Sequence, residues 1–407
     1  MRTKNSARFW MPVLCAALML SMLLSLGIGS ADIGPRDALR IIWNAIAEHP
    51  GKNVEDNGAE GLAPKMKGAS REETQTPADH GGRRLGEAGQ PITPETGGAS
   101  PEVARTTVPK TTVPRNGNLV PEAAVVLQIR LPRTVLAVLV GMLLAVSGVV
   151  MQAFFRNVMA GPYLVGVSSG AALGAVLAML LGWGFRFGGF STVPLSAFVF
   201  ALAVVALVYF LNYRRGKLQT EGLLLSGIAV ASAISAVVAL LMVMSSHSIH
   251  QVLFWLLGSL SAARWAHVEI VLPYAVAGMV VVVILARDMD LLLWGDVAGA
   301  SLGVQVQRTR TALLIAASLM TASAVAVTGI IGFVGLMVPH IARFLVGAMH
   351  RRLTIASAFL GGLLLLWADV LARTLWAPTE LPLGAITAIV GAPFLVYLCT
   401  RSRGGRA

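Results

Sequence analysis

Apolar residues gather in long runs along this chain instead of alternating with polar ones. A helical run of about 20 apolar residues crosses roughly 30 Å of hydrocarbon. We predict ten transmembrane helices, at residues 9–29, 131–154, 164–181, 193–211, 222–244, 268–286, 311–328, 333–346, 355–376 and 383–399. The apolar run 251–260 is too short to span a membrane, so it predicts a surface or re-entrant helix at the outer face.

The stretch 325–352 is the most informative of these runs. It is interrupted at four positions, Gly329, Gly332, Gly335 and Pro339. Membrane proteins accept such interruptions where neighbouring helices cover the freed backbone groups. We predict the end of one helix, a tight glycine-rich reversal, and a second helix that carries His340 and Arg343 toward the basic pair Arg351 and Arg352.

The pattern divides the chain into four parts: a first transmembrane helix (1–30), an external segment (31–129), a transmembrane core (130–400) and a cytoplasmic tail (401–407). Within the external segment, apolar residues at helical spacing over 32–47 predict an amphipathic helix. Residues 48–122 are rich in Gly, Pro, Thr and Glu, lack aromatic residues, and predict a disordered insertion. We expect the first helix to be retained, with a cleaved signal peptide as the alternative.

Composition supports a polytopic, all-α membrane protein. The 407 residues are 56% hydrophobic and 13% charged, whereas soluble domains carry about 25% charged residues. The net charge of +12 resides largely in short loops, where basic residues determine topology and do not indicate a nucleic-acid partner. With ten helices, both termini lie in the cytoplasm. Cys15 and Cys399 lie inside apolar runs and form neither a disulfide framework nor a metal site.

A weak internal repeat accompanies this pattern. Residues 146–148 (Val-Ser-Gly) resemble 327–329 (Val-Thr-Gly), and 164–166 resemble 345–347 (both Leu-Val-Gly) at the same offset. In a ten-helix arrangement the two copies run in opposite directions, which is typical of inverted-repeat transporters. The matches are short, so coincidence stays open.

The chain carries no catalytic set. It lacks the G-x-x-x-x-G-K-[ST] phosphate loop, and its histidines have no metal-ligand spacing, so we expect no enzyme activity, no metal and no cofactor. Asp369 is the only acidic residue well inside a predicted span. Arg373 follows it by one turn, which favours a structural ion pair over a proton-coupling site.

Three arginines lie at outer helix ends. Arg130 and Arg133 share a face at the start of the second helix, and Arg373 lies at the end of the ninth. They can extend to lipid phosphates, or they can attract an acidic soluble partner. Spacing alone leaves both alternatives open.

Two further segments are candidates for contacts. The cytoplasmic loop 287–310 is far more apolar than a solvated loop, which predicts a protein partner, with a membrane-dipping hairpin as the alternative. The fifth helix carries small residues that suit either close helix packing or a wide path with little side-chain grip. The candidate residues for lining a translocation path are Ser226, Gly227, Ala229, Ser232, Ala233 and Ala236.

Five motifs in the chain resemble those of one family. They are RLPR (130–133), LAVSGVVMQAFFRN (144–157), GPYLVGVSSGA (161–171), GFVGLMVPHIARFLVG (332–347) and ELPLG (380–384). They resemble the FecCD family, the permease subunits of binding-protein-dependent ABC importers for iron–siderophore, haem and cobalamin. Val158 and Gly161 depart from the family's RNPLADP pattern, at the turn after the second helix.

The resemblance implies a type II ABC importer permease fold in the cytoplasmic membrane. It implies a dimer of two permease subunits, two cytoplasmic ATPase subunits and an extracytoplasmic binding protein. Arg130, Arg133 and Arg373 match family positions that dock the binding protein, and the fifth helix matches the one lining the path. The segment 295–304 matches the ATPase coupling helices, and it supplies five candidate residues, Gly295, Asp296, Ala298, Leu302 and Gly303.

The predicted function is translocation of an iron(III)–siderophore or related metal chelate, driven by separate ATPase subunits. Haem or cobalamin is the alternative cargo. A secondary transporter driven by an ion gradient is the rival class, and only Asp369 and His340 are candidates for its coupling site.

Overall fold

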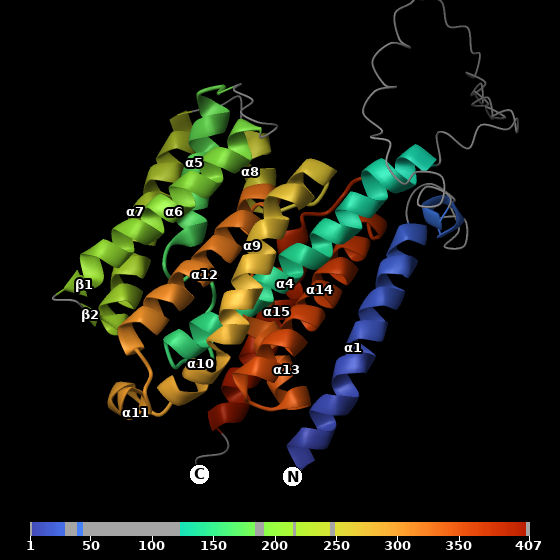
Figure 1. Cartoon of the computed structure of the whole chain (residues 1–407). Helices are drawn as coiled ribbons and strands as arrows, with labels where there is room; N and C mark the ends of the chain where they lie inside the picture. Colours follow the sequence, from blue (N-terminus) through green and yellow to red (C-terminus); the bar gives the residue numbers. More distant parts are fainter. Residues whose placement is uncertain are drawn as a thin grey trace, which may run out of the picture. The chain divides into compact units, whose positions relative to one another are not determined.

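Helices make up nearly all of the described chain (Figure 1). The structure is a computed structural model that describes residues 2–28, 39–43, 123–183, 191–214, 217–244 and 249–403. Its helices are α1 (Arg2–Gly27), the π-helix η2 (Val125–Arg130), α4 (Leu131–Phe154), α5 (Val167–Leu180), α6 (Thr192–Asn212), α7 (Thr220–Met244), α8 (Ile249–Leu256), α9 (Trp265–Ile284), α10 (Ala286–Leu292), α11 (Asp296–Ser301), α12 (Val306–Thr328), α13 (Val334–Val346), α14 (His350–Thr374) and α15 (Leu383–Arg403). A short antiparallel hairpin, β1 (Tyr213–Arg214) and β2 (Lys217–Leu218), joins α6 to α7.

The predicted set of ten apolar helices is confirmed within the described residues. Seven helices are long and apolar enough to cross a membrane, and α5, α13 and α15 are shorter apolar helices. The predicted short helix at 251–260 is α8, which begins and ends slightly earlier. Helix α1 begins and α15 ends on the same side of the bundle, where α11 also lies (Figure 1).

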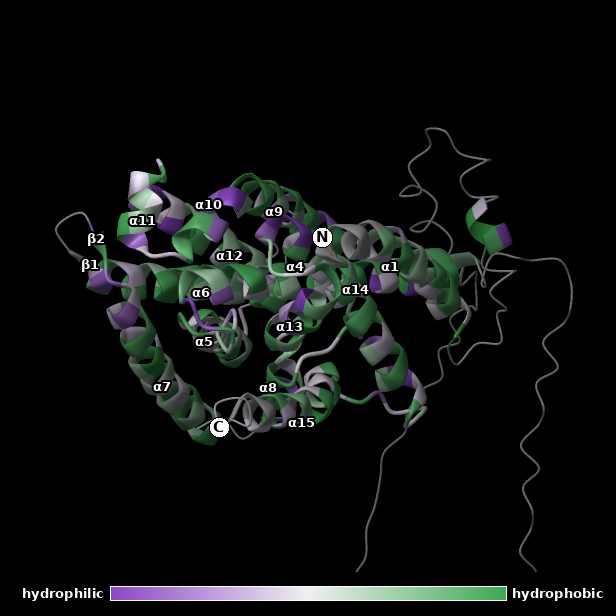
Figure 2. Cartoon of the chain, turned by 90° about the horizontal axis from the view of Figure 1, so that it is seen from below, coloured by the Kyte–Doolittle hydropathy of each residue, from purple (hydrophilic) through white to green (hydrophobic). Residues whose placement is uncertain are grey.

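Helix α4 lies at the centre of this bundle. Of the residues in the most apolar window of its segment, 83% are buried, against 11% for α7. It packs against α1, α9, α12, α13 and α14. Viewed from below, α7 and α15 lie on one side and α9 and α10 on the other (Figure 2). A helix apolar all around belongs in the interior of such a bundle, so α4 is the element that the others surround.

Glycines allow the backbone of α4 to meet two of its neighbours. A Cβ added at Gly141 would overlap the carbonyl of Gly361 in α14, and one added at Gly148 would overlap the carbonyl of Gly335 in α13. Small residues at such crossings let transmembrane helices approach closely. Gly335 and Pro339 both lie inside α13, in agreement with the predicted helix 333–346.

The predicted reversal between α12 and α13 is confirmed. Helix α12 ends at Thr328, and Gly329 follows with φ 73°. Phe333 also has a positive φ, 63°, directly before α13. Two residues with positive φ, at positions 329 and 333, turn the chain sharply. Position 329 also requires a glycine because a Cβ there would overlap the carbonyl of Trp255.

The short repeated motifs do not occupy equivalent places. Residues 146–148 lie in the interior of α4, whereas Thr328 is the last residue of α12. Gly166 precedes α5 and Gly347 follows α13. The triplets therefore give no register for a repeat, and the inverted repeat stays a prediction.

The external segment is described only in part. Residues 39–43 are helical, and Ile41 and Ile42 pack against Leu26 and Val126. This agrees with the predicted amphipathic helix over five of its residues. The predicted insertion 48–122 lies outside the described residues. At the other end, α15 continues to Arg403, into the predicted tail.

The crossing of α4 and α14 generates a stability prediction. Gly361→Ala places a methyl group against the carbonyl of Gly141 and the Cβ of Ala145. We expect a loss of about 2 kcal/mol or more in unfolding free energy, despite the better helix propensity of alanine. Gly161→Ala is the control, because nothing lies within 4 Å of its added Cβ. Equal unfolding curves in detergent for the two variants would contradict this packing.

Candidate functional site

Three arginines and two carboxylates form one ion cluster at the start of α4 and the end of α14. We call Arg130, Arg133, Asp369, Arg373 and Glu380 the arginine cluster. Arg133 lies in the first turn of α4 and is 9% exposed. Its Nε and Nη2 donate to Asp369 Oδ1 at 3.0 and 2.9 Å, and its Nη1 donates to Glu380 Oε1 at 2.8 Å. One guanidinium thus binds two carboxylates through charge-assisted hydrogen bonds.

The other two arginines hold the end of α1. Arg130 Nη1 donates to the carbonyl of Leu26 at 2.8 Å, and Arg373 Nη2 donates to the carbonyl of Ser25 at 2.9 Å. Cations at a helix C-terminus satisfy its last carbonyls and favour its dipole. Arg373 Nε also lies 3.6 Å from Asp369 Oδ2, which confirms the predicted ion pair one turn apart.

The arginine cluster differs in exposure from what the sequence suggested. Arg130, Arg133 and Arg373 were expected as cations at open helix ends, but their side chains are mostly buried and bound inside the chain. Burying an unpaired charge is costly, so the fold supplies carboxylates and carbonyls. Glu380 is the most exposed member, with 38% of its side chain accessible. Leu375 and Trp376 follow α14 on the surface, and Trp376 is 69% exposed. Docking by these arginines stays a prediction.

The segment 295–304 forms a short helix between two glycine turns. Gly295 and Gly303 have φ of 111° and 89°, which a side chain at either position would strain. Between them, α11 carries Asp296, which accepts hydrogen bonds from Arg310 at 2.7 Å and from Arg156. Arg156 follows the end of α4, and Arg310 lies in α12. Asp296 therefore fixes α11 to two transmembrane helices.

The exposed surface of this segment, together with Trp294 just before it, is apolar. Trp294 is 82% exposed and Val297 is 86% exposed, and Leu302 is also exposed. Ala298 is half-buried. Large apolar side chains held outside the spanning helices, on a helix pinned by two arginines, form a surface suited to a protein partner.

Helix α7 presents only part of the predicted path. Ala229, Ser232, Ala233 and Ala236 are exposed. Ser226 instead accepts a hydrogen bond from Asn212 Nδ2, and a Cβ at Gly227 would overlap the carbonyl of Leu164, so both face neighbouring segments.

A cavity of about 600 Å³ lies beside α7. Ser232 is the one predicted path residue that lines it, and Ile228, Ala231 and Ser235 are additional α7 residues there. Its opposite wall comes from the turn after α4 and from α13, through Met159, Gly161, Tyr163, Leu164 and Leu336. Tyr163 donates to the carbonyl of Ile331 at 2.6 Å, which braces this turn, and burial raises the pKa of Tyr163.

Sequence reasoning missed the partners of the charged residues. In the sequence, Glu380 and Arg156 stood out only as parts of the motifs 380–384 and 144–157, and Arg310 only as the end of the loop 287–310. Glu380 is 247 positions from its partner Arg133, and Arg156 is 140 positions from its partner Asp296. Arg310 is only 14 positions from Asp296 but lies on a different helix. A signal existed in the isolated Asp369, since a buried carboxylate requires a cation nearby. Within the described residues, no group of three or more His, Cys, Asp or Glu side chains is placed to hold a metal ion.

Comparison with known proteins assigns this architecture to one family. The model of the FecCD transport family matches residues 106–401. The chain belongs to the FecCD transport family. It is therefore the membrane-embedded permease of an ABC transporter, and the family is one of transport subunits rather than enzymes.

Named relatives extend the comparison. The chain is 48% identical to a cobalamin import system permease protein of Halobacterium salinarum, over 71% of this chain and 77% of that protein. It is 40% identical to a hemin transport system permease protein of Yersinia pestis, over 69% and 84%. A solved inward-facing, metal-chelate type ABC transporter matches with a TM-score of 0.63 and 32% identity, over 70% of this chain and 91% of that one. The type II permease fold is thus shown.

The arginine cluster predicts unequal roles for its two carboxylates. Asp369→Asn leaves Arg133 and Arg373 short of a buried counter-charge, and we expect it to cost about 3–5 kcal/mol of stability. Glu380→Gln changes a partly exposed group and should cost about 1 kcal/mol or less. Thermal unfolding of both variants in the same detergent checks this order, and a larger loss for Glu380→Gln would contradict the assignment.

Proposed function

We propose that this permease translocates a metal chelate of the iron(III)–siderophore class, using ATP hydrolysed by two separate ATPase subunits. The observation that carries the proposal is α11. It offers exposed Val297 to a partner, beside exposed Trp294 in the turn before the helix, while Asp296 binds Arg156 and Arg310 at the ends of α4 and α12. Movement of a partner docked there reaches the transmembrane helices directly, which is how a ligand can bias two conformations of a transporter.

Cobalamin is a second candidate cargo. The observation in its favour is the 48% identity to the cobalamin permease, against 40% for the hemin relative. The cavity beside α7 is lined mainly by small and apolar side chains, with serine hydroxyls and no charged side chain. Such a surface suits several bulky chelates, so specificity falls to a binding protein on the opposite side from α11.

The binding protein would dock over the arginine cluster. Arg130, Arg133 and Arg373 supply three positive charges against two carboxylates, and exposed Trp376 supplies an apolar contact beside them. An aromatic residue that a partner would bury, bordered by charges, is the usual composition of an interface hot spot. This docking surface and α11 lie at opposite ends of α4.

A second copy of the chain completes the path. The cavity beside α7 is open, and α7 carries exposed Leu225 and Leu240, with exposed Ile389 and Val396 on α15. Pairing these helices with their equivalents in a homodimer covers the apolar surface and closes the cavity. We place this assembly in the cytoplasmic membrane with both termini in the cytoplasm, on the side of α11.

Two exposed tryptophans provide a matched test of the two docking surfaces. Trp294→Ser should weaken ATPase binding about tenfold or more and leave binding-protein affinity unchanged. Trp376→Ser should weaken binding of the binding protein and leave ATPase binding unchanged, because each tryptophan belongs to only one of the two docking surfaces. Pull-down titrations with the cognate ATPase subunit and binding protein measure both. If either variant weakened both partners equally, the separation of the surfaces would be wrong.

Asp296 provides a test of coupling apart from docking. Asp296→Asn keeps the apolar face of α11 but removes the charge that binds Arg156 and Arg310. We expect ATPase subunits to bind and hydrolyse ATP while uptake falls about tenfold or more in proteoliposomes. Gln305→Ala, which alters an exposed contact of Arg308 in the same loop, is the control. Uptake per ATP equal to wild type in Asp296→Asn would contradict the coupling role.

The rival class, an ion-driven transporter, fits the geometry poorly. Asp369 is bound by Arg133 and Arg373. His340 stacks edge-on against Phe344 and Phe394. Both oxygens of the Asp369 carboxylate are thus engaged by arginines within the chain, so they offer no open site for a coupling ion.

A further inference from the structure

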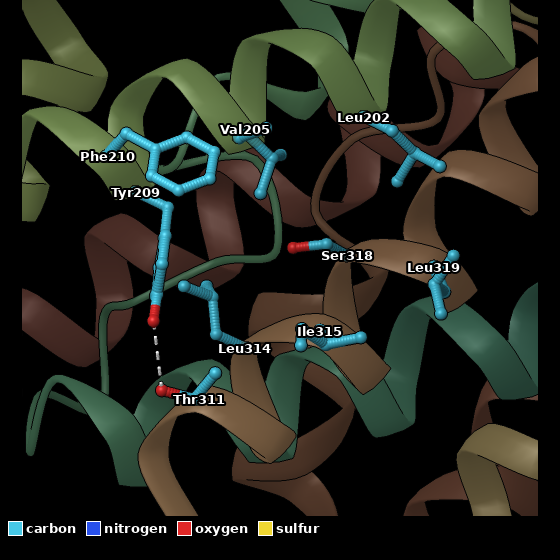
Figure 3. A pocket seen from close by; sticks show the side chains of 10 residues that line it. Leu202, Val205, Tyr209, Phe210, Thr311, Leu314, Ile315, Ser318 and Leu319 are labelled. Atoms are coloured by element: carbon cyan, nitrogen blue, oxygen red, sulfur yellow. Dashed lines mark hydrogen bonds between the residues drawn. The ribbon is translucent and has the colours of Figure 1, made fainter. Parts of the chain in front are cut away.

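A narrow apolar groove lies on the face of the bundle between α6 and α12 (Figure 3). Its volume is about 420 Å³, and its walls are almost entirely apolar. The side chains that form most of the walls are Leu202, Val205, Phe210, Leu314, Ile315 and Leu319. Both helices are candidate membrane spans, so the groove opens into the region of lipid chains. It is separate from the cavity beside α7, with which it shares no lining residue.

One end of the groove is polar and aromatic. The hydroxyls of Tyr209 and Thr311 lie 3.4 Å apart across it (Figure 3). The ring of Tyr209 stacks on that of Tyr213, with 5.3 Å between centroids. Tyrosines gather where a membrane meets water. Helix α6 ends at Asn212, which agrees with an interface at this level.

Two exposed cations lie close in sequence to the residues at this end, without lining the groove themselves. Arg308 is exposed and precedes Thr311 by three residues, which places it on the same face of α12. Lys217 is exposed in the β1–β2 hairpin. Leu218, beside Lys217, donates its backbone N–H to Gln307 Oε1 at 2.9 Å, so the hairpin is fastened to the first turn of α12. The nearby carboxylate of Glu221 lines a different cavity, together with Arg156 and Arg310.

We propose that this groove is a site for an anionic phospholipid. One acyl chain lies between α6 and α12, and the headgroup phosphate contacts Arg308 and Lys217. Arg308 uses one of its donors for Gln305, and the guanidinium carries five N–H groups in all. Basic residues beside an apolar crevice between membrane helices are the chemistry that selects anionic headgroups. The proposal goes beyond the transport function and does not depend on the cargo.

A second, similar groove supplies the control. It lies between α9 and α12, shares Ile315 and Leu319 with the first, and is lined by Ala277, Gly278 and Tyr274. Ala206 in the first groove and Ala277 in the second are both exposed alanines on spanning helices. Replacing either with tryptophan fills its groove without disturbing a buried side chain.

Ser318 offers an independent way to fill the first groove. Its hydroxyl points into the groove (Figure 3) and has no hydrogen-bond partner within the described residues. Ser318→Leu therefore adds apolar volume there without removing a hydrogen bond inside the described chain. If Ser318→Leu and Ala206→Trp reduce lipid retention alike, the reduction is due to filling the groove and not to the indole ring of the tryptophan.

The test is lipid retention by the purified full chain, measured by native mass spectrometry after incubation with dioleoyl phosphatidylglycerol or dioleoyl phosphatidylcholine. We expect wild type and Ala277→Trp to retain more phosphatidylglycerol than phosphatidylcholine. In Ala206→Trp and Ser318→Leu, the amount of retained phosphatidylglycerol should fall at least fivefold. Arg308→Gln and Lys217→Gln should each reduce the preference for phosphatidylglycerol about fivefold, the effect of one cation near an anionic lipid.

Three results would overturn the proposal. Equal retention in all variants would mean a general lipid shell. An equal loss in Ala277→Trp would mean that the grooves are not distinguished. Conversion of the dimer to monomer by Ala206→Trp, with lipid retention unchanged, would mean that a second copy of the chain occupies the groove.

Discussion

The close backbone contact of α4 with α13 and α14 is the constraint on which the other features depend. Gly141 meets Gly361, and Gly148 meets Gly335, with no room for a Cβ at either crossing. In a bilayer, where lipid chains are as apolar as leucine, helices associate through such packing rather than through hydrophobic burial. The contacts hold α4 in the interior, and 24 residues of helix extend about 36 Å, the thickness of the hydrocarbon core and more.

Each end of α4 carries an arginine that is bound by an acid from elsewhere in the chain. At the start, Arg133 binds Asp369 and Glu380; just past the end, Arg156 binds Asp296 of α11. A rigid helix with an ion pair at either end connects the two surfaces proposed for docking. In the proposed mechanism, a displacement of α11 by an ATPase subunit would act on the element that also organises the arginine cluster, with no flexible relay between them.

The sequence predicted the helices well because their lengths and apolar composition are set by the membrane itself. It also predicted the turn at Gly329 and the pair of Asp369 with Arg373, since both depend on neighbours in the chain. It could not predict why Gly335 is a glycine, because that depends on the backbone of α4 lying beside it. The same limit applies to Arg133, whose partner Asp369 is 236 residues away. Exposure was harder to predict: the sequence offered no internal partner for Arg130 or Arg133, and only the folded chain shows both of them bound.

Uptake by the reconstituted importer tests the central claim, that this chain is a passive path energised through α11, most directly. The chain is placed in proteoliposomes with the cognate ATPase subunits inside and the binding protein outside, and accumulation of labelled chelate is followed with and without internal ATP. We expect uphill accumulation only when ATP and all partners are present. Accumulation by the chain alone, driven by an imposed ion gradient, would contradict the account.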